Sequence, residues 1–310
     1  MPFVFQKKHL HNLLLVHLFY LSFKESGILI ATTKEQPIPM TNDQLLYYET
    51  HQTPSHTDWL VLVHGAGGST RTWKRQIDQL GAQYNLLVVD LPGHGQNSGR
   101  TFDIGRYSFE AITDKIWEVV DHLQIAKVHL VGISLGTILC LQMRISQPQR
   151  VLSVIMPGAI VRLNTKLRLL ANGSLTLAKV IGYRNFYKLS AYIMMPRGNH
   201  KQSRDVFIKE SHALTVEEFK NWTNLYYHLN ATLNEFFKST TTIPHILIMG
   251  SQDHLFLPPA KAYADFHKNA SISIIPNCGH VVSIEKAEQF NEICLSFLSQ
   301  LNIVNKEFLN

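Results

Sequence analysis

The chain contains few cysteines. Three occur in 310 residues, at Cys140, Cys278 and Cys294, and no two of them form a CxxC pair. An odd and widely spaced set argues against a disulfide framework and is typical of reduced thiols in a cytoplasm. We therefore expect a cytoplasmic protein whose cysteines fill its core.

Patterns that bind metals or phosphates are also missing. The 16 histidines include no HExxH motif and no paired metal-ligand spacing. The glycines form neither GxxxxGK[ST] nor GxGxxG, the signatures of phosphate-binding loops. No repeat and no low-complexity tract is present. The sequence predicts no metal, no cofactor and no nucleic-acid partner.

What the chain does contain is a series of short apolar runs, closed by turn residues, from Met40 onward. They are rich in β-branched or aromatic residues, as strands of a parallel sheet buried on both faces require. With 45% hydrophobic residues, one α/β domain with an insertion can bury a large core. The predicted strands are 44–50, 59–65, 85–91, 128–134, 151–158, 245–251 and 271–277.

Helical patterns alternate with these strands. Residues 109–124 form one such pattern. From Phe290 to Leu301, apolar residues recur at i, i+3, i+4, i+7, i+8 and i+11, which is one stripe on a helix that can lie on the sheet. The alternation predicts an α/β fold with a mostly parallel, doubly wound sheet.

One connection is far longer than a crossover needs. We expect residues 160–238 to form a helical cap, or lid, inserted after the sixth strand of the fold, and residues 40–159 and 239–310 to form the core. Such a cap would cover the carboxyl ends of the strands, where ligands bind in these sheets.

The amino end, residues 1–39, is an extension with two open interpretations. Two lysines precede the apolar stretch 10–23, which has the length of a signal-peptide core and is short for a membrane span. Either the extension is a start-site artefact and the chain begins at Met40, or residues 1–30 are a genuine export or membrane-surface segment. In the second case the protein is exported or membrane-associated, and this segment alone contacts the membrane.

A serine lies between two glycines in "GISLG", directly after a predicted strand and directly before a helical pattern. The motif alone is a weak signal, but its setting is that of a nucleophile elbow. There a strained turn holds the Ser134 hydroxyl clear of the backbone, and Gly132 and Gly136 remove Cβ atoms that would collide with neighbouring elements. We predict that Ser134 is a nucleophile and not a turn filler.

A serine nucleophile needs a base, and the base needs an orienting acid. Asp253 follows the predicted strand "HILIMG", and His280 follows the predicted strand "SISIIP". Each alone could be an ordinary loop residue. In the order Ser134, Asp253, His280, each after a later strand, they match a catalytic triad.

The segment "LVHGAGGST" supplies a glycine-rich turn after a strand. Such a turn lets backbone N–H groups face a developing oxyanion. We assign the two donors to the N–H groups of Ala66 and Leu135. His64 and Gly65, with the two elbow glycines, are assigned as structural loop residues, and His64 is not the base.

Together these motifs resemble the α/β-hydrolase fold superfamily, in its cap-bearing group of serine esterases, lipases and peroxidase-like enzymes. The resemblance covers about residues 44–300. In the family's DxPGxGxS turn, Asn97 stands at the usual serine position and Ser98 follows it, so the local turn is expected to differ. A serine at the elbow argues against haloalkane dehalogenases, whose relatives carry aspartate there.

The resemblance implies a carboxylic ester hydrolase, EC 3.1.1, that needs no cofactor. It would act through an acyl-enzyme on a small, largely hydrophobic ester or acyl substrate, as a monomer or homodimer. The same fold hosts C–C hydrolases, a menaquinone-pathway lyase and ligand-sensing signalling proteins without catalysis, and these alternatives stay open. A lyase would need anion-binding arginines in its pocket.

The inserted segment is basic. Between positions 160 and 238 there are 12 lysines and arginines but only five acidic residues. We favour a solvated surface, since most such charges face water; the alternative is that they steer an anionic substrate or meet an acidic membrane. The side chains expected to line an apolar acyl pocket are Phe186, Tyr187, Tyr192, Met194, Met195, Trp222, Tyr226 and Tyr227.

Overall fold

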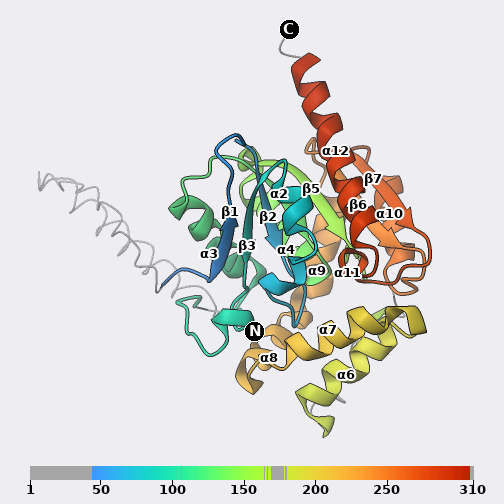
Figure 1. Cartoon of the computed structure of the whole chain (residues 1–310). Helices are drawn as coiled ribbons and strands as arrows, with labels where there is room; N and C mark the ends of the chain where they lie inside the picture. Colours follow the sequence, from blue (N-terminus) through green and yellow to red (C-terminus); the bar gives the residue numbers. More distant parts are fainter. Residues whose placement is uncertain are drawn as a thin grey trace, which may run out of the picture. The chain divides into compact units, whose positions relative to one another are not determined.

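The computed structural model describes residues 44–105, 107–163, 165, 167–168, 178 and 180–307, so the predicted extension over residues 1–39 lies outside the described residues. Seven strands form one sheet in the order β1-β3-β2-β4-β5-β6-β7 (Figure 1). Strand β1 runs antiparallel to β3, and every other neighbouring pair is parallel. The strands are β1 (Tyr48–His51), β2 (Trp59–Val63), β3 (Asn85–Val89), β4 (Val128–Gly132), β5 (Val151–Pro157), β6 (His245–Gly250) and β7 (Ala270–Ile275).

All seven predicted strands are present, and the α/β, mostly parallel, doubly wound sheet is confirmed. One detail differs. The long insertion follows β5, the fifth described strand, whereas the prediction placed it after the sixth. A sixth strand before the insertion would require two strands ahead of β2, whereas the described residues contain only β1 there.

Helices cover both faces of the sheet (Figure 1). Because side chains alternate along a strand, Val61 and Val63 belong to a core shared with α3, α4 and α10. Leu60 and Leu62 belong to a second core, shared with α2 and α12. The helices are α2 (Ile77–Gly81), α3 (Phe109–His122), α4 (Leu135–Ser146), α10 (Leu257–Phe266) and α12 (Ala287–Glu307).

The two helices with clear sequence patterns form as expected. Ser108 caps α3, its hydroxyl accepting from the N–H of Ala111 at 3.1 Å, and satisfies one of the free amides of the first turn. On α12 the predicted stripe faces the sheet, with Phe290, Cys294 and Leu298 fully buried. Sheet burial on both sides thus explains why these helices are amphipathic.

In the described part of the chain between β5 and β6, four helices have defined bounds, and we call them the insertion helices. Helix α8 begins with a capping box, in which Thr215 and Glu218 exchange side-chain to backbone hydrogen bonds. The insertion helices are α6 (Tyr183–Met194), α7 (Lys201–Ser211), α8 (Val216–Asn224) and α9 (Tyr226–Lys238). Short elements elsewhere are η2 (Thr70–Trp73), η3 (Gly95–Asn97), η4 (Pro148–Arg150), η5 (Gly198–His200) and α11 (Val282–Glu285).

The turn after β3, which departs from the family pattern at Asn97, is held by hydrogen bonds of this side chain. Asn97 Nδ2 donates to the carbonyl of Asp90 at 2.6 Å, and Asn97 Oδ1 accepts from the N–H of Tyr47 at 2.9 Å. The hydroxyl of Ser98 donates to the carbonyl of Ala213, just before α8. Asn97 therefore closes the turn, and Ser98 ties it to the inserted segment.

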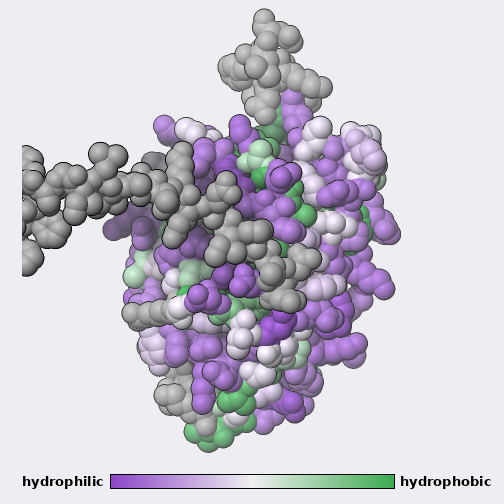
Figure 2. Space-filling view, turned by 90° about the vertical axis from the view of Figure 1, so that its left-hand side faces the viewer, coloured by the Kyte–Doolittle hydropathy of each residue, from purple (hydrophilic) through white to green (hydrophobic). Residues whose placement is uncertain are grey.

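The described surface is mostly polar. Figure 2 shows a hydrophilic face on which apolar side chains gather at the lower edge, the level at which α6, α7 and α8 lie in Figure 1. Several large apolar side chains of the insertion are exposed, including Val180, Leu189, Val216 and Tyr227. None of the helices in the described ranges is both long and apolar enough to cross a membrane.

A charged side chain lies inside the core, beside the last turn of α4. Arg144 is 2% exposed, and neither of its terminal nitrogens has a hydrogen-bond partner among the described residues. Burial lowers the pKa of Arg144, and the nearby Tyr263 partly opposes this shift. A buried charge without an acid destabilises the folded state.

We expect Arg144→Met to raise the free energy of unfolding by about 1–3 kcal/mol, because it replaces a buried unpaired charge by an apolar chain of similar length. Urea unfolding measures this. Arg150→Met is the matched control and should destabilise, since Arg150 pairs with Asp121 at 2.6 Å and lies 4.5 Å from the ring centre of Trp117. A lower unfolding midpoint for Arg144→Met would contradict the expectation.

Candidate active site

The turn between β4 and α4 holds Ser134 in a strained backbone conformation. Its φ is 55° and its ψ is −115°, a region that L-residues rarely adopt. The strand ends at Gly132 and the helix begins at Leu135, so the chain reverses within two residues. The N–H of Ser134 donates to the carbonyl of Pro157 at 3.2 Å, which fixes the turn against the next strand.

The two glycines of the elbow are required by contact distances. A Cβ on Gly132 would lie 2.3 Å from the carbonyl oxygen of Gly136, and a Cβ on Gly136 would lie 2.3 Å from the carbonyl oxygen of Val63. Real Cβ atoms do not approach backbone oxygens this closely. Helix α4 can therefore pack directly on β2 and β4 only with glycine at both positions.

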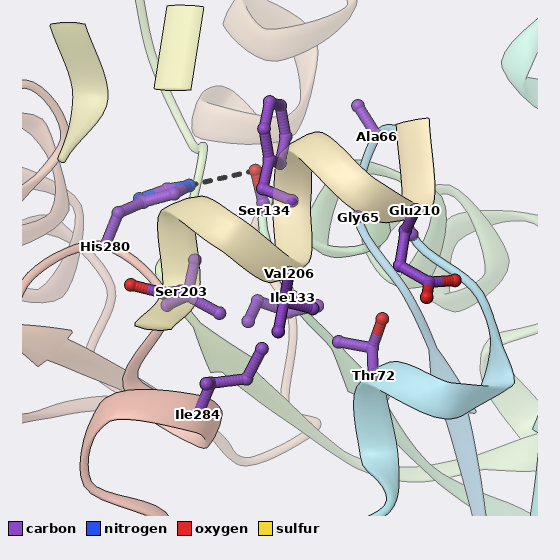
Figure 3. A pocket seen from close by; sticks show the side chains of 13 residues that line it. Gly65, Ala66, Thr72, Ile133, Ser134, Ser203, Val206, Glu210, His280 and Ile284 are labelled. Atoms are coloured by element: carbon purple, nitrogen blue, oxygen red, sulfur yellow. Dashed lines mark hydrogen bonds between the residues drawn. The ribbon is translucent and has the colours of Figure 1, made fainter. Parts of the chain in front are cut away.

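The three predicted catalytic side chains form one chain of hydrogen bonds. His280 Nε2 lies 3.0 Å from Ser134 Oγ, the contact that Figure 3 marks, and His280 Nδ1 lies 2.7 Å from Asp253 Oδ2. His280 and Asp253 are 2% and 1% exposed. The three residues follow β4, β6 and β7, whose carboxyl ends meet at one edge of the sheet.

Asp253 is itself held in place. Its Oδ1 accepts from the N–H of Phe256 at 3.1 Å, which leaves Oδ2 directed to the imidazole. The Phe256 ring lies 4.9 Å from the ring of His280, centre to centre. These contacts orient the imidazole so that one nitrogen faces the carboxylate and the other faces the serine.

The two backbone donors assigned to an oxyanion flank the serine. Ala66 lines the same cavity as Ser134, and Leu135 is the residue that follows it. Among the described residues, neither N–H group has a hydrogen-bond partner. Gly65 also lines the cavity. The geometry thus leaves two amides free beside the hydroxyl.

A pair of buried histidines supports the loop that carries Ala66. His64 accepts from the N–H of Leu91 at 3.0 Å through Nε2, and its Nδ1 lies 2.8 Å from the carbonyl of Gly65. His94 accepts from the N–H of Gly67 at 3.0 Å. Burial lowers the pKa of His64 to about 3 and that of His94 to about 4, so both stay neutral acceptors. These contacts place His64 where it can support the loop.

These shifts predict acid sensitivity. Below pH 6.5 an unfolded chain protonates both histidines, whereas the folded protein resists protonation down to about pH 4 for His94 and about pH 3 for His64. The stability that the neutral imidazoles contribute is present above pH 6.5 and is lost as the pH falls. Each can contribute up to about 1.4 kcal/mol per pH unit in this window.

Urea unfolding at pH 5, 6 and 7 measures that slope. His94→Gln should lower the slope of unfolding free energy against pH by the equivalent of up to one proton, because one of the groups that take up a proton on unfolding is removed. His228→Gln is the control, since His228 is exposed on α9 and faces water in both states. A slope that His94→Gln leaves unchanged would show that His94 does not resist protonation in the folded protein.

The cavity beside Ser134 is small and closed on one side by an insertion helix. Its volume is about 40 Å³, which holds about three water-sized groups. Helix α7 contributes Ser203, Val206 and Glu210 to its lining (Figure 3). Phe207 of the same helix also lines the cavity. The core contributes Gly65, Ala66, Gly68, Thr72, Ile133, Ser134, His280, Val281 and Ile284.

The prediction that eight aromatic and methionine side chains of the insertion line an acyl pocket is wrong for the cavity at Ser134. None of the eight side chains lines the cavity at Ser134. Tyr187 packs against the rings of Phe207 and Phe219, Trp222 donates to the carbonyl of Pro92, and Tyr227 is 70% exposed. The sequence of α7 is too polar to mark it as a pocket wall, and only tertiary packing places it over the serine.

The insertion is also tied to the loops that carry Asp253 and His280. His200 Nε2 lies 2.8 Å from Gln252 Oε1, one residue before the aspartate. Glu285 accepts from the hydroxyl of Ser203 at 2.7 Å and from the N–H of Gly279 at 2.6 Å, one residue before the histidine. Sequence reasoning missed this buried network, because polar residues in loops and helix starts give no signal of burial.

No group of three or more histidine, cysteine, aspartate and glutamate side chains in the described ranges has an arrangement that could hold a metal ion. The three cysteines are free and buried. Burial raises the pKa of the Cys140 and Cys278 thiols far above the ordinary value, so neither is a thiolate nucleophile at neutral pH. The reactive group that the site presents is the serine hydroxyl.

A doubly wound sheet with a serine elbow and a histidine–aspartate pair at its carboxyl edge defines a class, the α/β hydrolases. The family model of the alpha/beta hydrolase fold matches residues 58–287. The chain belongs to the α/β-hydrolase fold family.

Named relatives share this fold and differ in their reactions. A Yersinia enterocolitica protein named as a carbamate hydrolase, RutD, is 26% identical over 260 residues, which cover 82% of this chain and 92% of that protein. An Escherichia coli 2-hydroxy-6-oxononadienedioate/2-hydroxy-6-oxononatrienedioate hydrolase is 25% identical over 268 residues, covering 78% of this chain and 87% of that protein.

Solved structures show the same fold. A hydrolase of Oleispira antarctica has a TM-score of 0.72 at 17% identity, covering 83% of this chain and 95% of that chain. A carboxylesterase of the thaumarchaeon Nitrososphaera gargenis has a TM-score of 0.66 at 22% identity, covering 83% and 95%. The family model and the named relatives, taken together, support a hydrolase of this fold.

Proposed function

We propose that the protein is a serine hydrolase that cleaves carboxylic esters, of class EC 3.1.1, through an acyl-enzyme. The observation that carries the proposal is the hydrogen-bonded chain from Ser134 Oγ through the His280 ring to Asp253 Oδ2. In this role Ser134 is the nucleophile, His280 the base and Asp253 the group that orients the imidazole. The Ala66 and Leu135 amides are the oxyanion donors.

The reaction follows from these positions. The Ser134 hydroxyl attacks the ester carbonyl carbon while His280 Nε2 takes its proton. The carbonyl oxygen gains the negative charge and accepts hydrogen bonds from the two free amides. The imidazolium, stabilised by Asp253, then protonates the leaving alcohol. Water activated by the same imidazole releases the acid and restores the serine.

Ester hydrolysis is favoured over the other reactions of the fold by the lining of the cavity. No lysine or arginine is among the described residues that line it. The carboxylate-rich substrates that a menaquinone-pathway lyase, or a hydrolase of a dioate such as the Escherichia coli relative, would take therefore find no cation there to pair with. An uncharged ester needs no such partner.

We further propose that residues 160–238 act as a cap whose contacts close the site. The bonds from Ser203 to Glu285 and from His200 to Gln252 hold α7 against the loops of the base and the acid. With α7 in this position, the enclosed space beside Ser134 is about 40 Å³, which suits a short acyl chain. A longer chain would extend beyond this space or require α7 to move away.

The nucleophile is tested by labelling with a fluorophosphonate, which reacts with an activated serine. Ser134→Ala should abolish labelling and lower ester hydrolysis by roughly 10⁴-fold or more, since it removes the attacking oxygen. His280→Ala should have a similar effect, and Asp253→Asn a smaller one. Hydrolysis of 4-nitrophenyl butanoate by each purified variant measures this.

Ser203→Ala is the matched control for labelling. Ser203 lines the same cavity, but its hydroxyl bonds to the Glu285 carboxylate at 2.7 Å and to the backbone carbonyl of His200 at 2.9 Å, so neither of these partners is an imidazole nitrogen. The variant should still be labelled at Ser134. Residual hydrolysis by pure Ser134→Ala near the wild-type rate would refute the nucleophile assignment.

The small cavity predicts a preference for short acyl chains. Across 4-nitrophenyl acetate, butanoate, hexanoate and octanoate, kcat/KM should be highest at four carbons or fewer and then fall. Phe207→Ala should move the optimum to longer chains, because the ring of Phe207 forms part of the wall. One added methylene in an apolar pocket changes kcat/KM by about 10-fold or more.

Phe186→Ala is the control for this change. Phe186 belongs to the same aromatic cluster of the insertion, with its ring 5.9 Å from that of Tyr187, but it does not line the cavity. It should leave the order of the four esters as in the wild type. An identical order in Phe207→Ala would mean that the acyl chain does not reach this wall.

A further inference from the structure

The cavity at Ser134 carries a carboxylate on its wall. Glu210 lies in the last turn of α7 and is only 8% exposed. Figure 3 shows the Glu210 side chain extending from α7 on the side of Ser134 opposite to His280. The site thus has the imidazole at one side of the serine and a buried acid at the other.

One of the two Glu210 oxygens is fully engaged. Oε2 accepts from the hydroxyl of Ser69 at 2.6 Å and from Arg71 Nη2 at 2.8 Å and Nε at 3.2 Å. Ser69 follows Ala66 in the same loop and Arg71 lies in η2 directly after it, so the acid is held to the segment that carries a proposed oxyanion donor. This fixes where the carboxylate stands relative to the serine.

The other oxygen is free. Among the described residues, Glu210 Oε1 has no hydrogen-bond partner. A carboxylate oxygen at the cavity wall that has no donor from the protein can accept a hydrogen bond from a bound substrate, and a hydrogen bond to a charged group contributes about 1.5–3 kcal/mol. A donor on the substrate would satisfy it.

The charge of the site selects the kind of donor. Arg71 lies on Glu210 and balances its charge, so the pair as a whole is neutral. A substrate ammonium would have to lose its hydration without a net opposite charge, whereas a hydroxyl or amide N–H needs only the free acceptor. The excess of lysine and arginine in the insertion acts at its surface, whereas the charged insertion side chain at the cavity wall is Glu210.

We propose that Glu210 is a specificity-determining residue, which accepts a hydrogen bond from a hydroxyl or amide N–H on the short acyl part of the substrate. The acyl part is the part that stays on Ser134 after the alcohol leaves, so a wall beside the serine can select it. The inference rests on the proposed esterase function. It makes a short hydroxyacyl or amide-bearing ester the preferred substrate.

Three 4-nitrophenyl esters of nearly equal size test this: 3-hydroxypropanoate, butanoate and 3-aminopropanoate. They place a hydroxyl, a methyl or an ammonium at the same point of the chain. For the wild type, kcat/KM, divided by the rate of uncatalysed hydrolysis, should be about tenfold or more higher for the hydroxy ester than for butanoate. The ammonium ester should not exceed the hydroxy ester.

Two substitutions assign the preference to the carboxylate. Glu210→Gln keeps the size but presents a weaker, uncharged group, so the preference should fall severalfold. Glu210→Met removes the acceptor, and butanoate should become the better substrate. Circular dichroism and urea unfolding confirm that both variants fold.

Glu218→Gln is the matched control. Glu218 is also an insertion carboxylate that is 8% exposed and accepts from a core loop, the N–H of Gly99 at 2.9 Å. It does not line the cavity. This variant should keep the wild-type preference for the hydroxy ester.

The outcomes separate this inference from the proposed function. If Ser134 is not labelled and no ester is hydrolysed, the esterase proposal fails. The Glu210 contact is then still measured by calorimetry, as the affinity of Ser134→Ala for 3-hydroxypropanamide against butanamide. If esters are hydrolysed but butanoate equals the hydroxy ester, or Glu210→Met keeps the hydroxy preference, the inference is overturned. A clear preference for the ammonium ester would overturn the choice of a neutral donor.

Discussion

The close approach of α4 to the sheet is the constraint on which the rest of the site depends. Helix and strands come together only because Gly132 and Gly136 have no Cβ, since either Cβ would lie 2.3 Å from a backbone oxygen. That contact forces the chain to reverse sharply at Ser134, whose positive φ directs the hydroxyl out of the sheet edge. It also leaves the N–H of Leu135 without a partner among the described residues, because the first amides of a helix have no intrahelical acceptor.

Burial then decides how the groups around this turn behave. His280 and Asp253 are almost fully enclosed, so their hydrogen bond is not exchanged for bonds to water. His64 and His94 are enclosed too, but each faces a backbone N–H, and burial keeps them neutral. The same residue type thus belongs to the proposed triad in one place and contacts backbone amides of a loop in another, according to its neighbours.

The insertion determines the size and the polarity of the cavity. Its surface is basic, yet the charged side chain that it places at the cavity wall is Glu210. This carboxylate pairs with Arg71 of the core. A net charge counted along a segment describes long-range attraction, which salt screens over about 10 Å. A substrate inside the cavity meets the local group. For this reason the proposed specificity follows the single buried acid and not the excess of lysine and arginine.

The sequence by itself determined the sheet and the position of the reactive groups along it. The seven apolar runs predicted the seven strands, and "GISLG" predicted the elbow because strand, turn and helix leave local patterns. Asp253 and His280 could be placed because each follows a strand, and parallel strands end at one edge. Only the tertiary structure decided what lies above that edge. Glu210, Ser203 and Phe207 lie on α7, whose polar sequence carries no mark of burial, and the aromatic residues chosen in their place pack elsewhere. Contacts between segments far apart in the chain determine a pocket wall, and no local sequence pattern predicts such contacts.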